Sequence, residues 1–207
     1  MANDNFPRGL FPINFNPKAD AHYYRASTAG TDIFFGQPVD LVSAGFVGNV
    51  IDITTAGIVQ AIGVAIGFAG PLKKGLATDD PFLDVSDLTT LAAGLEAGDR
   101  WVLVADNPVQ RFIVQGDTGG TLATLAAIGE SAALIYRATS GDTSTGWANL
   151  ELDASSNAAS TGQIVKILGL HDVVNVDGTE NTTGNYAKFV VMIQTHRLNP
   201  ANLASAV

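Results

Sequence analysis

The sequence predicts an all-β protein. About ten short runs are rich in β-branched and aromatic residues, dipeptides typical of turns separate them, and helical periodicity is nearly absent. The composition agrees, because 46% of the 207 residues are hydrophobic, 15% are charged and 22 are glycines, as in a turn-rich β protein. We expect one antiparallel β domain at residues 22–207, built as a small barrel, a β-tulip or a jelly-roll-like sandwich. An extended N-terminal arm precedes it at residues 1–21, and helices are at most short.

The arm is the first element. Prolines at positions 7, 12 and 17 each fix φ and remove a backbone donor, which favours an extended strip over a helix or a sheet. The strip carries large apolar side chains that need a surface to cover them: Phe6, Leu10, Phe11, Ile13 and Phe15. That surface is either the chain's own domain or a neighbouring subunit. We expect the strip to be ordered only against another chain.

The β domain follows as a series of strand-like runs. In order, these runs are residues 22–26, 32–42, 47–53, 57–72, 100–106, 110–116, 131–138, 149–153, 163–170 and 187–196. The turn dipeptides between them are Asn107-Pro108, Gly119-Gly120, Gly141-Asp142 and Asp177-Gly178. Only residues 87–97 and 121–128 have a pattern that suits a short helix.

The run at residues 57–72 alternates in side-chain size. Its bulky residues fall on one face of an extended chain: Ile58, Ile62, Val64, Ile66 and Phe68. Alanine and glycine dominate the other face, so we expect the bulky face to be buried and the small face to let another layer approach. Residues 53–72 contain no charge, but a period of 2 indicates a strand and not a membrane-spanning helix.

A short strand also lies between two polar loops at residues 140–161. Leu150 and Leu152 should point to one face of this strand and Glu151 to the other.

Charge and motifs exclude several functions. A net charge of −9 with no basic run opposes nucleic-acid binding. The chain has no cysteine, its three histidines are far apart, and it lacks the nucleophile-elbow, phosphate-loop and dinucleotide motifs. We therefore expect no enzyme activity, no catalytic residues, no bound metal and no cofactor.

Two acidic stretches need separate interpretations. Residues 78–99 hold six acids and no base, which suits either a solvated face or a docking surface for a basic partner; a hydrolase that uses these carboxylates is a further alternative. Residues 171–181 superficially resemble a calcium loop, but the glycine and the closing glutamate are misplaced, so we interpret them as a hairpin loop.

The N-terminus lacks the basic start and apolar run of a signal peptide, so we expect synthesis without export.

Several blocks of the chain resemble a known family. They are GLFPI (9–13), HYY (22–24), IFFGQPVDLV (33–42), IGVAIG (62–67), RWVLVADNPVQRFIVQGD (100–117), LELD (150–153), KILGL (166–170) and AKFVVMIQTHRL (187–198). In this order they resemble the capsid-associated structural proteins of tailed bacteriophages that act as head decoration or cement proteins. The resemblance implies a β-rich fold, no catalysis, and binding of an oligomer to the outside of the assembled head.

From the resemblance and the composition we expect a protein that binds the major capsid protein and stabilises the capsid lattice. It would be a homo-oligomer, a trimer in preference to a dimer, made in the bacterial host cytoplasm and carried on the outer surface of the virion, without nucleic-acid or membrane partners. Arm residues expected to contact the capsid or a sister subunit are Phe6, Arg8, Leu10, Phe11 and Phe15. The alternative is a receptor- or carbohydrate-binding module of a virion surface, with Trp147 and Tyr136 beside the polar loop at residues 140–146.

Overall fold

The prediction of an all-β protein is confirmed. The computed structural model describes residue 5 and residues 7–26, 32–43, 46–49, 60–69, 100–118, 127–153, 155–156, 163–172 and 180–199. These ranges contain twelve strands and no α-helix. None of them contains a helix with the length and apolarity that crossing a membrane requires.

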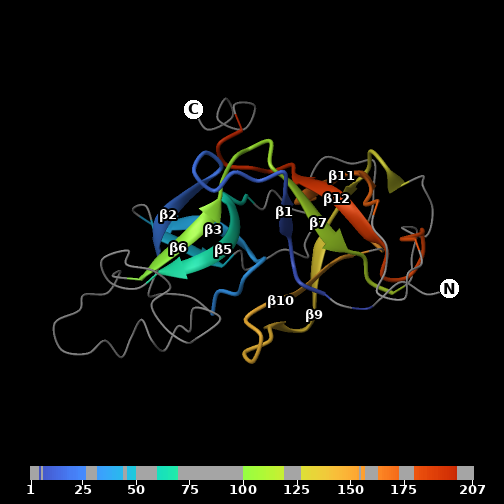
Figure 1. The fold of residues 1–207 in the computed structure, drawn as a ribbon, viewed down its shortest axis with the longest axis horizontal. Coiled ribbons are helices and arrows are strands. Elements are labelled where there is room, and N and C mark those ends of the chain that lie inside the picture. The colour runs from blue at the N-terminus through green and yellow to red at the C-terminus, as the bar shows by residue number, and fades with distance from the viewer. Residues whose placement is uncertain are drawn as a thin grey trace.

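Five strands close into a small barrel (Figure 1). They are β2 (Ala21–Ala26), β3 (Pro38–Ser43), β4 (Phe46–Asn49), β5 (Gly63–Ala69) and β6 (Trp101–Ala105). Their order around the barrel is β2-β4-β3-β5-β6, and every pair is antiparallel except β2 with β4. Small and branched residues fill the interior: Ala26, Ile33, Val39, Val47, Ile62, Ala65, Val102 and Val104.

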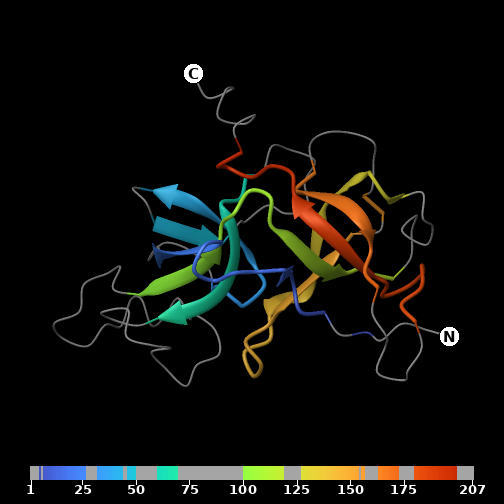
Figure 2. The same cartoon turned by 45° about the horizontal axis from the view of Figure 1, so that its top comes forward.

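A second sheet lies beside the barrel (Figure 2). Its order is β1-β7-β12-β11-β8, formed by β1 (Phe11–Ile13), β7 (Arg111–Gln115), β8 (Ser131–Ala132), β11 (Val165–Leu170) and β12 (Lys188–Ile193). A hairpin of β9 (Leu134–Gly141) and β10 (Ala148–Leu152) packs against the same core. Strand β12 alternates strictly between buried and half-buried residues, as expected of a sheet with one face in the core.

The main core lies between the second sheet, the hairpin and the outside of the barrel. Phe112, Val114 and Phe189 enter it from the sheet, Leu150 from the hairpin and Val64 from barrel strand β5. Each of these side chains is buried. Because the outer wall of the barrel is part of this core, the barrel and the second sheet stabilise each other.

The N-terminal strip packs against its own chain over residues 7–20. Strand β1 pairs with β7, with Phe11 opposite Ile113, and Leu10 is completely buried in the main core. The expectation that the strip is ordered only against another chain is therefore wrong. The strip lies on its own domain because a vacant edge of β7 and an apolar site for Leu10 are both within reach.

Two glycines let the strip cross the chain before β3. The Leu10 amide donates to the Gly36 carbonyl oxygen over 2.8 Å. Gly9 and Gly36 have φ values of 69° and 86°, and a Cβ atom on either would overlap backbone of the opposite segment. A side chain at either position would separate the strip from the body.

The face assignment at residues 57–72 is only partly right. Ile62 and Val64 are buried, but Ile62 lies inside the barrel and Val64 in the main core, while Ile66 and Phe68 are half-buried. A register shift between Ala65 and Gly67 sets Ile66 against the main core and Phe68 against the barrel core, because a bulge adds one residue to a strand of period 2. Ile62 differs from Val64 because it precedes β5. Both faces are covered here, and Ile58 lies outside the described residues.

Most other predicted runs contain a strand, with bounds that differ by a few residues. The run at 32–42 becomes a strand only from Pro38, and the one at 47–53 is described to residue 49 as β4. The run at 131–138 divides into β8 and β9. Residues 87–97, 121–126 and 173–179 lie outside the described part of the chain, and so do the turn dipeptides at 119–120 and 177–178.

We predict that Gly36→Ala destabilises the protein more than Gly129→Ala. Both glycines have a φ near 90°, but Gly129 has open space around its Cβ position. Gly129→Ala should cost about 1–2 kcal/mol through backbone strain alone. Gly36→Ala should cost about 1–3 kcal/mol more, because the new methyl group must displace the Arg8 carbonyl. Urea unfolding of both variants measures the difference, and equal costs would show that the crossing is not tight.

Candidate interaction surface

An aromatic cluster with an arginine forms on the surface where the strip meets the hairpin. We call Arg8, Phe11, Phe35 and Trp147 the Trp147 patch. The Phe35 ring lies 4.5 Å from the Trp147 ring, edge to face, and the Phe11 ring lies 6.2 Å from it. The Arg8 guanidinium carbon lies 5.5 Å from the centre of a Trp147 ring. Phe11 and Arg8 are exposed, whereas Phe35 and Trp147 are half-buried.

Backbone pairing holds this patch in place. Phe35 and Trp147 form an isolated parallel bridge, in which the Phe35 amide donates to the Gly146 carbonyl and the Ala148 amide donates to the Phe35 carbonyl, each over 2.9 Å. Gly146 has a φ of 75°, which glycine adopts at little cost. Trp147 is thus fixed by the hairpin, by the segment before β3 and by the strip.

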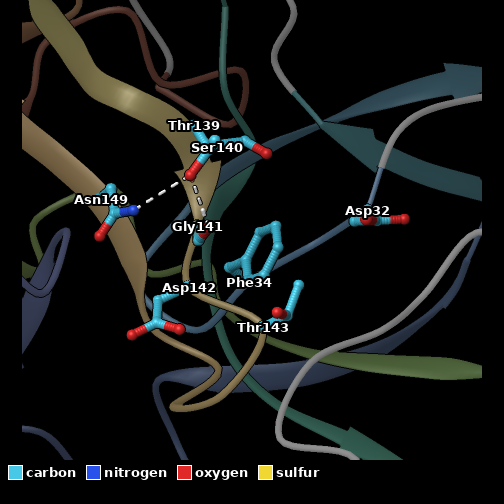
Figure 3. A pocket seen from close by; sticks show the side chains of 8 residues that line it. All are labelled: Asp32, Phe34, Thr139, Ser140, Gly141, Asp142, Thr143 and Asn149. Carbon is cyan, nitrogen blue, oxygen red and sulfur yellow. Dashed lines mark hydrogen bonds between the residues drawn. The ribbon is translucent and has the colours of Figure 1, made fainter.

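A shallow hollow of about 500 Å³ lies on the hairpin (Figure 3). It is lined by Asp32, Phe34, Thr139, Ser140, Gly141, Asp142, Thr143 and Asn149. The Asn149 amide donates to Thr139 Oγ1 over 3.2 Å, and that hydroxyl donates to the Gly141 carbonyl. The Asp142 carboxylate accepts from the Ser144 amide and hydroxyl, which holds its pKa below the usual range. The wall is therefore rich in oxygen atoms.

The two aromatic residues expected at a carbohydrate site are not in this wall. The Tyr136 hydroxyl accepts a 2.6 Å hydrogen bond from Gln37 Nε2, and Gln37 is completely buried. Trp147 belongs to the patch described above. The aromatic ring of the hollow comes from Phe34, whose side chain packs tightly against Gly141 and is 2% exposed.

The polar cluster that most resembles a catalytic site lies on the barrel. His22 Nδ1 is 2.9 Å from both carboxylate oxygens of the buried Asp106, and the Tyr24 hydroxyl donates to the same carboxylate over 2.6 Å. Burial, and then the bond to Asp106, raise the pKa of Tyr24, so its phenol stays a neutral donor. Neither an oriented His–Asp pair nor the tyrosine supplies the nucleophile and oxyanion donors of acyl transfer. The cluster joins β2 to the end of β6.

A buried carboxylate lies under the start of the strip. Glu151 is 2% exposed, lies 3.3 Å from Arg137 Nη1 and accepts a 2.7 Å bond from Gln115 Nε2. Arg137 and Gln115 also donate to the Asn5 side-chain oxygen. These partners agree with the expectation that Glu151 points away from Leu150 and Leu152. The Glu151 carboxylate does not reach solvent, because Arg137, Gln115 and Asn5 surround it.

The structure separates the five strip residues expected to contact a partner. Arg8 and Phe11 lie in the Trp147 patch, Leu10 is buried in the main core, and Phe15 packs half-buried against that core. Phe6 lies outside the described residues. A contact of Arg8, Phe11 or Phe15 with another protein stays a prediction, whereas Leu10 has no exposed surface with which to make one.

The remaining candidate residues are histidines and carboxylates. Within the described ranges, no three His, Asp or Glu side chains come together as a metal site would require. His171 is half-buried after β11, and His196 is buried beside the barrel, where desolvation lowers its pKa. The carboxylates of residues 79–99 lie outside the described residues. Searches against protein-family models and against curated proteins give no match to this chain.

Phe35 is the patch residue that the sequence left unassigned. It lies within a run that reads as a strand, so it was indistinguishable from a core position. Its neighbour Phe34 does enter the core. The two adjacent phenylalanines followed by glycine are the signal that one ring turns inward and the other outward.

We predict that Glu151 gives the protein a distinct pH dependence of stability. Burial raises the pKa of the Glu151 carboxyl above its unfolded value, although Gln115 and Arg137 oppose the shift. As the pH falls from neutral toward that raised pKa, the folded state takes up a proton before the unfolded chain does, so the free energy of unfolding rises. The gain is complete below the unfolded pKa.

Glu151→Gln cannot titrate, so it should lose this contribution. We expect the stability of the wild type relative to the variant to increase as the pH falls from 7 to 4. Urea unfolding at several pH values measures this difference, and a relative stability that decreases with falling pH would contradict the assignment.

Proposed function

We propose that this chain is a capsid decoration protein of a tailed bacteriophage, which binds the outer surface of the head and stabilises the capsid lattice. The observation that carries the proposal is the Trp147 patch. Tryptophan, other aromatic residues and arginine are the residue types that dominate binding energy at protein interfaces. Here they sit on a β frame braced by backbone hydrogen bonds, and the described residues bring together no set of metal ligands.

The function in this proposal is mechanical. A rigid β frame that spans neighbouring capsid subunits adds buried interface and so resists separation of the lattice. The partner is the major capsid protein, and the chain acts as a homo-oligomer, a trimer in preference to a dimer. It is made in the host cytoplasm and carried on the virion surface. The resemblance of the sequence blocks to such proteins supports the same proposal.

The second candidate is a carbohydrate-binding module of a virion surface. The oxygen-lined hollow of about 500 Å³ favours it, because hydroxyl groups of a sugar pair with carboxylate, amide and hydroxyl side chains such as Asp32, Asn149 and Thr139. The absence of Tyr136 and Trp147 from this wall weakens it, since exposed aromatic rings usually stack on sugars.

The test of the first proposal is sedimentation of the purified chain with DNA-filled heads of its phage, assembled without this protein. We expect saturable binding at a fixed ratio to capsid subunits, and Phe11→Ala with Trp147→Ala should weaken it about tenfold or more, as loss of hot-spot residues does. Val109→Ala is the control, because Val109 is 70% exposed and lies outside the patch. Heads that sediment without the chain at any concentration would reject the proposal.

A glycan array tests the second candidate. If the hollow is a sugar site, retained glycans should be lost on Asn149→Ala and kept on Phe11→Ala, because only Asn149 lines the hollow. Retention that both variants leave unchanged would exclude the hollow as the site.

A further inference from the structure

The outward face of the second sheet differs in charge from the rest of the chain. Strands β1, β7, β8, β11 and β12 carry Arg111, Lys166 and Lys188 and contain no acidic residue. The whole chain has 20 acids against 11 lysines and arginines, a net charge of −9. The net charge of these five strands is therefore positive, opposite in sign to that of the whole chain.

Strand register places these cations on one face. Arg111 is opposite Met192, and Met192 is opposite Lys166, so the three form one row across β7, β12 and β11. Residues directly opposite each other on neighbouring strands share a face. The residues that alternate with this row, such as Phe112 and Val191, are buried in the main core. The row thus points away from the core.

Apolar side chains lie beside the cations on the same face. Phe11 is opposite Ile113, and Ile113 is opposite Val190, which forms a second row next to the first. Phe11 is 43% exposed, and Ile113, Val190 and Met192 are half-buried. We call the two rows, together with Lys188, the basic sheet face.

Within the described ranges, none of the ion pairs includes Arg111, Lys166 or Lys188. The ion pairs there are His22–Asp106, Arg137–Glu151 and Arg197–Asp40. Glu151 lies beside Gln115 at the end of β7, but it is buried and already paired with Arg137. The basic sheet face therefore presents apolar side chains between cations that take part in none of these ion pairs.

We propose that the basic sheet face is the surface by which the chain docks onto an acidic, partly apolar protein surface. This inference rests on the proposed function, under which that surface is the outside of the head. A second copy that presents this same face does not fit, because a two-fold contact would bring like charges together. Nucleic acid does not fit well either, since phosphates need cations and leave an apolar row between them uncovered.

Two matched double variants test the inference. Arg111→Glu with Lys166→Glu reverses two charges on the basic sheet face. Lys18→Glu with Arg25→Glu reverses two exposed charges on the strip and on β2. Each pair changes the net charge by −4, so general repulsion from an acidic head is equal in both. Surface substitutions of this kind have small effects on stability, which circular dichroism and urea unfolding check, and Arg111→Gln with Lys166→Gln provides a milder pair.

Binding to DNA-filled heads assembled without the chain is measured by sedimentation. We expect the face variant to raise the dissociation constant about tenfold or more, because like charges in an interface are costly, and the control variant to stay within about twofold of the wild type. The glutamine pair should fall between them.

Three outcomes would overturn the inference. Equal binding by wild type and face variant would remove the basic sheet face while leaving the proposed function intact. Displacement of the wild type from heads by short duplex DNA, with no such effect on the face variant, would make the face a nucleic-acid site. Absence of head binding by the wild type would remove the proposed function and this inference together.

Discussion

The structure depends on the segment before β3, where the two halves of the fold meet. The Gly36 carbonyl accepts from Leu10 of the strip, and the Gly36 amide donates to Ala65 of the barrel. Gln37 is completely buried, and its backbone carbonyl accepts from the Ala65 amide. Its side-chain oxygen accepts from the Phe34 amide, and its side-chain nitrogen donates to Tyr136 of the hairpin. A buried side-chain amide with both ends hydrogen-bonded favours one arrangement, because any other leaves polar groups unsatisfied.

Both proposed surfaces follow from this junction. Phe35 holds Trp147 from one side while the strip places Arg8 and Phe11 against it. The same strip continues as β1, which adds Phe11 to the edge of the basic sheet face. Phe11 therefore belongs to both the Trp147 patch and the basic sheet face, and the two surfaces meet there. A partner that covers Phe11 touches both.

The sequence was sufficient where a strand obeys a simple period. The run that became β12 alternates as expected, because one of its faces lies in the core. The run containing Ile66 failed, because a bulge changes the phase and neighbouring layers cover both faces. The burial of Glu151 depends on Arg137 and on Asn5, which is 146 positions away in sequence, and the contact of Gly9 with Gly36 spans 27 positions. No local pattern encodes such contacts.

The N-terminal strip is an integral part of this fold and not a detachable arm. Native-state hydrogen exchange of the Leu10 amide measures this, because that amide donates to Gly36 at the crossing. We expect Leu10 to exchange only through global unfolding, with the same opening free energy as the core amide of Ile167, which donates to the Glu130 carbonyl. Exchange of Leu10 through a local opening several kcal/mol cheaper than global unfolding, with Ile167 still protected, would contradict it.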